Sequence, residues 1–204
     1  MIKERPIIFS GLMVRAILEG RKSQTRRMKG LELLNEQPDR WRREGDIFAF
    51  DGGFEYLAVP KCPYGVPGDR LWVRESFFIP DAPYKAKNSH LVSYKADETN
   101  QPALQYTGWR PSIHMPRWAS RITLEIVTIR VERVQKISET DAVAEGIEPD
   151  GPVNWDDLTS CWRNYDPHET AAYWNSPRDS FHSLWSAING ADSWVWVLDF
   201  KRVA

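Results

Sequence analysis

A short basic segment at residues 20–27 holds the residue types best suited to chemistry. Lys22 and Thr25 stand close together there, among several arginines. A threonine hydroxyl is a poor nucleophile until a neighbouring group takes its proton. A lysine that is desolvated or surrounded by other cations is pushed toward the neutral form, which can act as that base. The segment therefore indicates a nucleophile with its base, or a binding site for an anion.

The charge is local, because the whole chain has a formal net charge of −1. The cations of this segment and its neighbour are Arg21, Lys22, Arg26, Arg27 and Lys29. A small basic patch on a nearly neutral protein favours a nucleotide-like ligand over long duplex DNA. The alternative is a solvated patch that complements the C-terminal dipole of a preceding helix.

Aromatic and acidic residues elsewhere in the chain supply further candidates. Most of the 10 tryptophans are expected in the core, but Trp72 and Trp109 are candidates for stacking on a base. Glu75 follows Arg74 on an expected strand, so one of the two side chains points inward. Glu145 stands just before a glycine at a helix end, where a carboxylate is slightly disfavoured by the dipole.

Composition excludes several classes of protein. Two cysteines are too few for a disulfide framework, and the four histidines show no metal-binding spacing. The apolar runs are far shorter than the roughly 20 residues that span a bilayer, and the first residues lack a signal-peptide pattern. We therefore expect a cytoplasmic protein without a metal, another cofactor or a membrane partner.

Turn and capping signals divide the chain into short elements. Helices are predicted at residues 10–20, 138–146 and 176–189, each starting at a serine that is able to cap it. Strands are predicted at 46–50, 54–59, 71–77, 91–94, 121–134 and 194–200. The long strand shows a phase slip that indicates a bulge. The last helix is expected to bury Phe181, Leu184, Trp185 and Ile188. Without a βαβ alternation, the class is α+β.

Four ordered stretches resemble the ASCH family, a branch of the PUA-like superfamily. The family pattern GxKxxxxR is met by Gly20, Lys22 and Arg27, and the closer pattern GRKTxTxR is met except at Ser23. The other stretches are residues 67–75, 137–147 and 196–200. The whole chain is similar to the larger ASCH proteins of bacteriophages and prophages. The resemblance implies one domain over residues 1–204, a PUA-like small mixed β-barrel with about three short helices. It has two long insertions, near 79–118 and 148–175, and a further one near 30–66.

The resemblance also implies a function. Some small ASCH proteins are hydrolases that remove the acetyl group of N4-acetylcytidine with a Lys, a Thr and a Glu. These correspond to Lys22, Thr25 and Glu145, with Glu75 as an alternative carboxylate. The partner expected is RNA, a nucleoside or a nucleotide; a non-catalytic reader of RNA or modified bases and a ribonuclease are the alternatives. The expected ligand-binding residues are Arg21, Arg26, Arg27, Trp72, Glu75 and Trp109.

Overall fold

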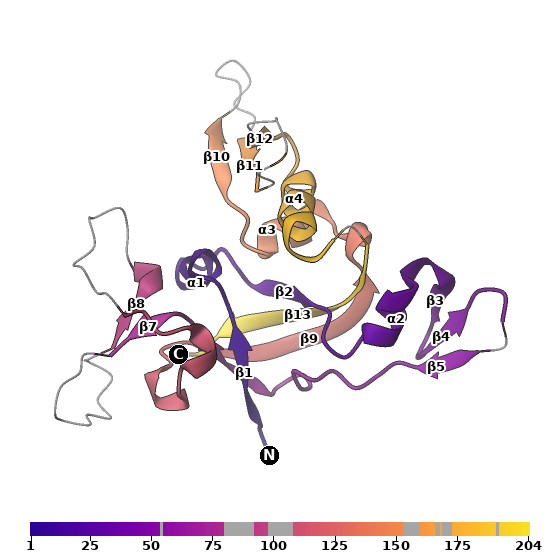
Figure 1. Cartoon of the computed structure of the whole chain (residues 1–204), viewed down its shortest axis with the longest axis horizontal. Helices are drawn as coiled ribbons and strands as arrows, with labels where there is room; N and C mark the ends of the chain where they lie inside the picture. The colour runs from indigo at the N-terminus through magenta and orange to yellow at the C-terminus, as the bar shows by residue number, and fades with distance from the viewer. Residues whose placement is uncertain are drawn as a thin grey trace. The chain divides into compact units, whose positions relative to one another are not determined.

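The structure is a computed structural model of the whole chain. It describes residues 1–53, 55–79, 92–97, 108–152, 160–165, 168, 173–190 and 192–204. Much of the expected insertions near 79–118 and 148–175, and the first residue of the strand expected at 91–94, lie outside the described residues. Figure 1 shows the course of the chain.

The described part of the chain is mixed α/β. Its four α-helices are α1 (Gly11–Leu18), α2 (Glu32–Glu36), α3 (Glu139–Ala144) and α4 (Pro177–Asn189). Its strands are β1 (Glu4–Ile8), β2 (Gln24–Arg27), β3 (Trp41–Glu44), β4 (Ile47–Phe50), β5 (Tyr56–Ala58), β6 (Arg70–Arg74), β7 (Phe77–Phe78), β8 (Ser93–Tyr94), β9 (Thr123–Arg133), β10 (Pro149–Pro152), β11 (Ser160–Arg163), β12 (Tyr173–Trp174) and β13 (Trp194–Arg202).

The chain forms two compact units, each built from separate stretches of sequence. Unit 1 contains Met1–Arg21, Tyr64–Val127 and Phe200–Ala204, and unit 2 contains Lys22–Pro63 and Thr128–Asp199. In unit 1, β1 pairs in parallel with β6, and β6 pairs antiparallel with the start of β9. Leu71 and Val73 alternate with the partly buried Arg70, Trp72 and Arg74 along β6 and are fully buried, so this face of the strand contributes to the core.

Unit 2 has a core between α3, α4 and β13. Its buried side chains include Ala142, Phe181, Trp185, Val195 and Val197. Strand β2 pairs antiparallel with β13, while β3, β4 and β5 form one small antiparallel sheet and β10, β11 and β12 form another. These elements hold the residues discussed below.

The expected closed barrel is not observed. The largest sheet has the strand order β1-β6-β9-β13-β2, and β9 and β13 each continue from one unit into the other. Among the described residues, β1 and β2 each have one hydrogen-bonded neighbour in this order. The sheet is therefore open, with two edge strands, and the short β2 does not extend the ladder back to β1.

Helix ends were predicted well because local capping decides them. The hydroxyls of Ser10, Ser138 and Ser176 each accept a hydrogen bond from a backbone N–H three residues later. Gly20 and Gly146 follow α1 and α3 with φ of 76° and 82°, a conformation that favours glycine. The strands expected at 46–50 and 194–200 are confirmed as β4 and β13.

The prediction that Ile188 belongs to the core is wrong. Ile188 is 63% exposed, and α4 buries Ser180 and Ser183 beside Phe181 and Trp185 instead. The Ser180 hydroxyl donates to the carbonyl of Arg163 at 2.6 Å. Hydrogen bonds to the neighbouring backbone therefore turn α4 toward β11, and its last turn leaves the core.

Strand β3 was not predicted. Residues 30–45 gave no firm pattern, because three of the four β3 side chains are charged and exposed and only Trp41 is buried. Within the part of the chain that the structure describes, no helix has the length and apolar character needed to cross a membrane.

Candidate functional site: a buried lysine in a network of charges

Strand β2 presents its side chains alternately to two faces of the sheet. Gln24 and Arg26 contact acidic residues on one face. Thr25 and Arg27 lie directly opposite Leu198 and Trp196 of β13. Directly opposed residues of an antiparallel pair share a face, so Thr25 and Arg27 point away from the acidic residues.

The side chain of Lys22 contacts the C-terminal end of α3. Its Nζ donates to the backbone carbonyl of Glu145 at 2.6 Å and to Oε2 of the same residue at 2.7 Å. The backbone N–H of Ser23 donates to the carbonyl of Ala144 at 2.9 Å. The last carbonyls of a helix have no intrahelical partner, so Lys22 completes the helix end and pairs with the adjacent carboxylate.

Arg26 is the second buried cation. Its guanidinium donates to Glu145 Oε1 at 3.1 Å, to Glu132 Oε1 at 2.7 Å and to Asp141 Oδ2 at 3.3 Å. It also donates to Gln24 Oε1 at 2.6 Å. Arg26 Nε is buried without a hydrogen-bond partner among the described residues. Arg26 is therefore occupied by several acceptors rather than open to a ligand.

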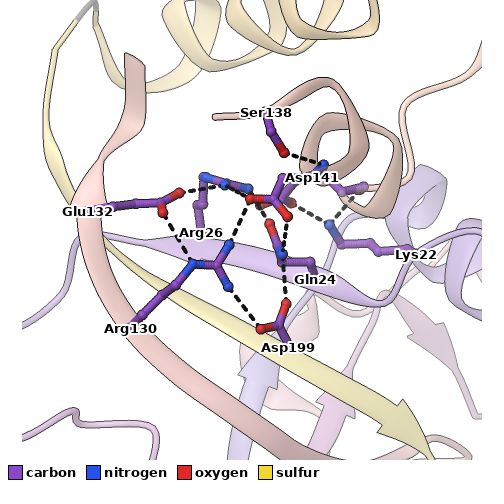
Figure 2. Close-up of polar contacts among 9 residues, drawn as sticks. Lys22, Gln24, Arg26, Arg130, Glu132, Ser138, Asp141 and Asp199 are labelled. Carbon is purple, nitrogen blue, oxygen red and sulfur yellow. Dashed lines mark hydrogen bonds and ion pairs between the residues drawn. The ribbon is translucent and has the colours of Figure 1, made fainter. Parts of the chain in front are cut away.

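The outer part of the network is acidic and partly exposed. Figure 2 shows Arg130 of β9 pointing toward Asp199 of β13 and Asp141 of α3. Its ion pairs with these two residues are 2.9 and 2.7 Å long. The Gln24 amide donates to both Asp199, at 2.6 Å, and Asp141, at 3.0 Å. One glutamine thus joins α3 to β13.

The network has an inner and an outer end. The side chains of Lys22 and Arg26 are 0% exposed, while those of Arg130 and Asp199 are 35% and 30% exposed. The name "charge network" is used below for three cationic and four carboxylate side chains: Lys22, Arg26, Arg130, Glu132, Asp141, Glu145 and Asp199.

Burial changes the acid–base behaviour of Lys22. Loss of water around the ammonium group lowers the pKa of Lys22, and the nearby Arg27 and Arg26 charges lower it further. The carboxylate of Glu145 acts in the opposite direction but does not cancel the effect. A lysine with a lowered pKa is closer to the neutral form that accepts a proton.

Asp141 links the charge network to stability in acid. Burial alone would raise its pKa, but the Gln24 hydrogen bond and the Arg130 and Arg26 charges lower the pKa of Asp141 below its usual value. A carboxyl with a lower pKa in the folded state contributes stability above its unfolded pKa of about 3.9, and this is lost as the pH falls through the folded pKa.

We expect Asp141→Asn to flatten the loss of stability below about pH 4, because this residue no longer titrates. Urea unfolding followed at several pH values measures the effect. An unchanged slope below pH 4 in the variant contradicts the prediction.

The structure brings together two of the three residues expected to act together. Lys22 and Glu145 are in contact, whereas Thr25 is 2% exposed and lies on the other face of β2. Arg27 shares the face of Thr25. Arg21 belongs to unit 1 and pairs with Glu19 at 2.6 Å.

The remaining candidates lie in unit 1, in separate surroundings. Glu75 is 2% exposed and forms an ion pair with Arg121 at 3.0 Å, and burial raises the pKa of its carboxyl. Trp72 lies on β6 under the guanidinium of Arg74, 5.4 Å from the ring centre. Trp109 makes an edge contact with Phe78 at 6.3 Å. The carboxylate that contacts Lys22 is Glu145.

The outer residues of the charge network were missed from the sequence. The available signal was Asp199, a lone carboxylate within an apolar strand. Arg130 and Glu132, on either side of buried Val131, were a second signal. Polar residues at alternate positions of a strand indicate one polar face. Among the described residues, no group of three or more His, Cys, Asp or Glu side chains is arranged to hold a metal ion.

Comparisons of the chain with models of protein families, with curated proteins and with solved structures gave no match. The resemblance to ASCH proteins therefore depends on the four sequence stretches and stays a prediction.

Proposed function

We propose that the chain is an ASCH-type protein that binds a nucleoside, nucleotide or RNA and hydrolyses an acylated base such as N4-acetylcytidine. On this proposal its fold is a PUA-like variant whose sheet remains open. The single observation that supports catalysis is the fully buried Lys22 Nζ, 2.7 Å from Glu145 Oε2. A titratable group with a pKa shifted by burial and a specific charged partner is a typical feature of a functional site.

The proposed reaction uses Lys22 as the base. Neutral Lys22 takes a proton from water while the water oxygen bonds to the acyl carbon. The C–N bond of the amide then breaks, and the ammonium of Lys22 returns the proton to the departing amine nitrogen. Glu145 orients Lys22 throughout. Water is the proposed nucleophile rather than Thr25, because the Thr25 side chain lies on the other face of β2.

The proposed reaction requires that the substrate reach Nζ of Lys22. The Lys22 side chain is 0% exposed and that of Glu145 is 6% exposed. A substrate therefore reaches Nζ only when the C-terminal end of α3 moves away from β2. The partly exposed Arg130 and Asp199 are the first residues that a substrate meets at the outer end of the charge network.

The direct test follows cytidine release from N4-acetylcytidine. We expect turnover by the unmodified protein and activity within a few-fold for Thr25→Val, which keeps the shape of a buried residue and removes its hydroxyl. A loss of about 10³-fold in Thr25→Val would instead make Thr25 the nucleophile. The control is a matched sample of the unmodified protein denatured with urea, in which we expect no turnover.

The second candidate function is a non-catalytic reader of RNA or modified bases. Lys22 and Arg26 are completely buried in ion pairs, as purely structural charges can be. This burial favours a reader over an enzyme that uses Lys22 as its base. RNA binding without turnover on any acylated nucleoside supports the reader, and cleavage of the RNA during the binding assay supports a ribonuclease.

A further inference from the structure

A second concave site lies in unit 2, beside the small β3-β4-β5 sheet. It is a hollow of about 730 Å³ between β3, the end of β9 and the 3-10 helix η6 (Val134–Lys136). Pockets for small organic ligands typically have volumes of about 300–1,000 Å³. The lining residues are Asp39, Trp41, Arg42, Arg43, Val131, Glu132, Arg133, Gln135, Lys136, Asp192 and Trp194.

The acidic side chains of this hollow are already neutralised. Arg133 pairs with Asp39 at 2.7 Å and also with Asp192. Both carboxylate oxygens of Glu132 are engaged, one by Arg26 and the other by Arg130. These three carboxylates therefore add little negative potential to the hollow.

Three cations of the lining are less compensated. Lys136 and Arg43 are exposed and form no ion pair with a carboxylate in the described part of the chain, although Arg43 donates to the backbone carbonyls of Gly45 and Val131. Arg42 is 68% exposed and is 3.5 Å from Asp51, an exposed pair of the kind that contributes little. The hollow consequently has a surplus of positive charge and favours an anionic ligand.

The other wall is apolar and rigid. Trp194 donates through Nε1 to the carbonyl of Pro38 at 3.1 Å, and the ring of Phe48 packs against it at 4.9 Å. Trp41 and Val131 lie beside it in the lining and are buried to more than nine-tenths. Arg133 lies over the Trp194 ring, 5.5 Å from its centre, so this wall offers the hollow a narrow apolar strip of indole edge and aliphatic carbon.

We propose that this hollow binds a small phosphorylated molecule with a flat ring, of the class of the nucleoside monophosphates. The phosphate lies against Lys136, Arg42 and Arg43, which supply charge-assisted hydrogen bonds. The edge of the flat ring lies against the narrow apolar strip of Trp41, Val131 and Trp194. The site is separate from the Lys22–Glu145 pair: of the charge network, only Glu132 lines the hollow. Its test is therefore independent of the hydrolase proposal.

Calorimetric titration with each of the four nucleoside 5′-monophosphates tests the assignment. We expect measurable binding, with the matching nucleoside and inorganic phosphate each at least about tenfold weaker, since each lacks one half of the ligand. Lys136→Glu should weaken monophosphate binding by about tenfold or more, because it replaces a charged hydrogen-bond donor with a like charge.

Lys61→Glu is the matched control, since Lys61 is exposed in the same unit and does not line the hollow. It makes the same charge change and should leave binding within twofold. Arg42→Glu is a second test variant at another exposed position. Absence of binding to the unmodified protein at millimolar ligand overturns the assignment, and so does equal weakening by Lys61→Glu and both lining variants.

Discussion

Replacing Glu145 with glutamine is expected to lower the free energy of unfolding by about 3–5 kcal/mol, the usual cost of leaving a buried charge without its partner. The Glu145 side chain is 6% exposed and accepts from both Lys22 and Arg26, whose side chains are 0% exposed. Glutamine keeps the shape of the residue but removes the carboxylate charge that pairs with Lys22, while Arg26 keeps its ion pairs with Glu132 and Asp141. Urea unfolding of the variant measures the loss.

Two comparisons separate this effect from a general effect of removing an acid. Glu19→Gln breaks an exposed ion pair with Arg21 and should cost only about 0–1 kcal/mol. Adding Lys22→Met to Glu145→Gln should recover part of the stability, because it removes the buried charge that has lost its carboxylate. If Glu145→Gln costs no more than Glu19→Gln, burial of the network contributes nothing to stability.

Lys22→Arg is expected to reduce hydrolysis of the acylated nucleoside by about 10²–10⁴-fold, the range that a positioned general base supplies. Arginine keeps the positive charge beside Glu145 but cannot lose its proton near neutral pH. The variant therefore separates the proposed base from the structural cation. Both kcat and kcat/KM are to be measured, with the unfolding free energy checked in parallel.

The pH dependence of the rate provides the second readout. The rate should rise with pH as Lys22 loses its proton and should level off below the ordinary lysine pKa of about 10.4, because burial lowers the pKa of Lys22. Lys29→Arg, at an exposed position just after the basic segment, should keep the full rate and the same profile. Undiminished turnover in Lys22→Arg would remove Lys22 from the mechanism.

The sequence was sufficient to predict the helix ends, because contacts between near neighbours in the chain determine them. The serines at 10, 138 and 176 cap their helices through contacts three residues away. Gly20 and Gly146 adopt the positive φ expected after a helix. Neither feature depends on the rest of the fold, so a single sequence is enough to predict it.

Features set by packing between distant segments were not predictable. Ile188 fits a helical stripe, yet Ser180 of α4 finds a backbone partner in β11, and the buried face of the helix changes. The barrel was expected from the family resemblance, but whether two edge strands meet is decided by strand lengths and twist across the whole sheet. Strand β3 lacks an apolar alternation because only Trp41 is covered.

The candidate site shows the same division. The resemblance placed a carboxylate at Glu145 beside Lys22, and the two residues are in contact. Spacing alone did not reveal that Thr25 and Arg26 occupy opposite faces of β2, since no strand was predicted at residues 24–27. The same basic segment is able to form an exposed patch or part of a buried charge network. Its acidic partners decide between the two, and they lie more than 100 residues away in the sequence.

The interleaved composition of the two units affects how the chain is able to fold during synthesis. Unit 1 needs residues 1–21 together with Phe200–Ala204, and Phe9 contacts Phe200 with ring centres 6.2 Å apart. Unit 2 needs Lys22 together with residues up to Asp199. Neither unit is therefore complete until the stretch that ends near Asp199 has left the ribosome. Domains of most chains fold in order from the N-terminus. Here the stretches before residue 23 wait for the stretches near residue 200, and long-range contacts of this kind slow folding.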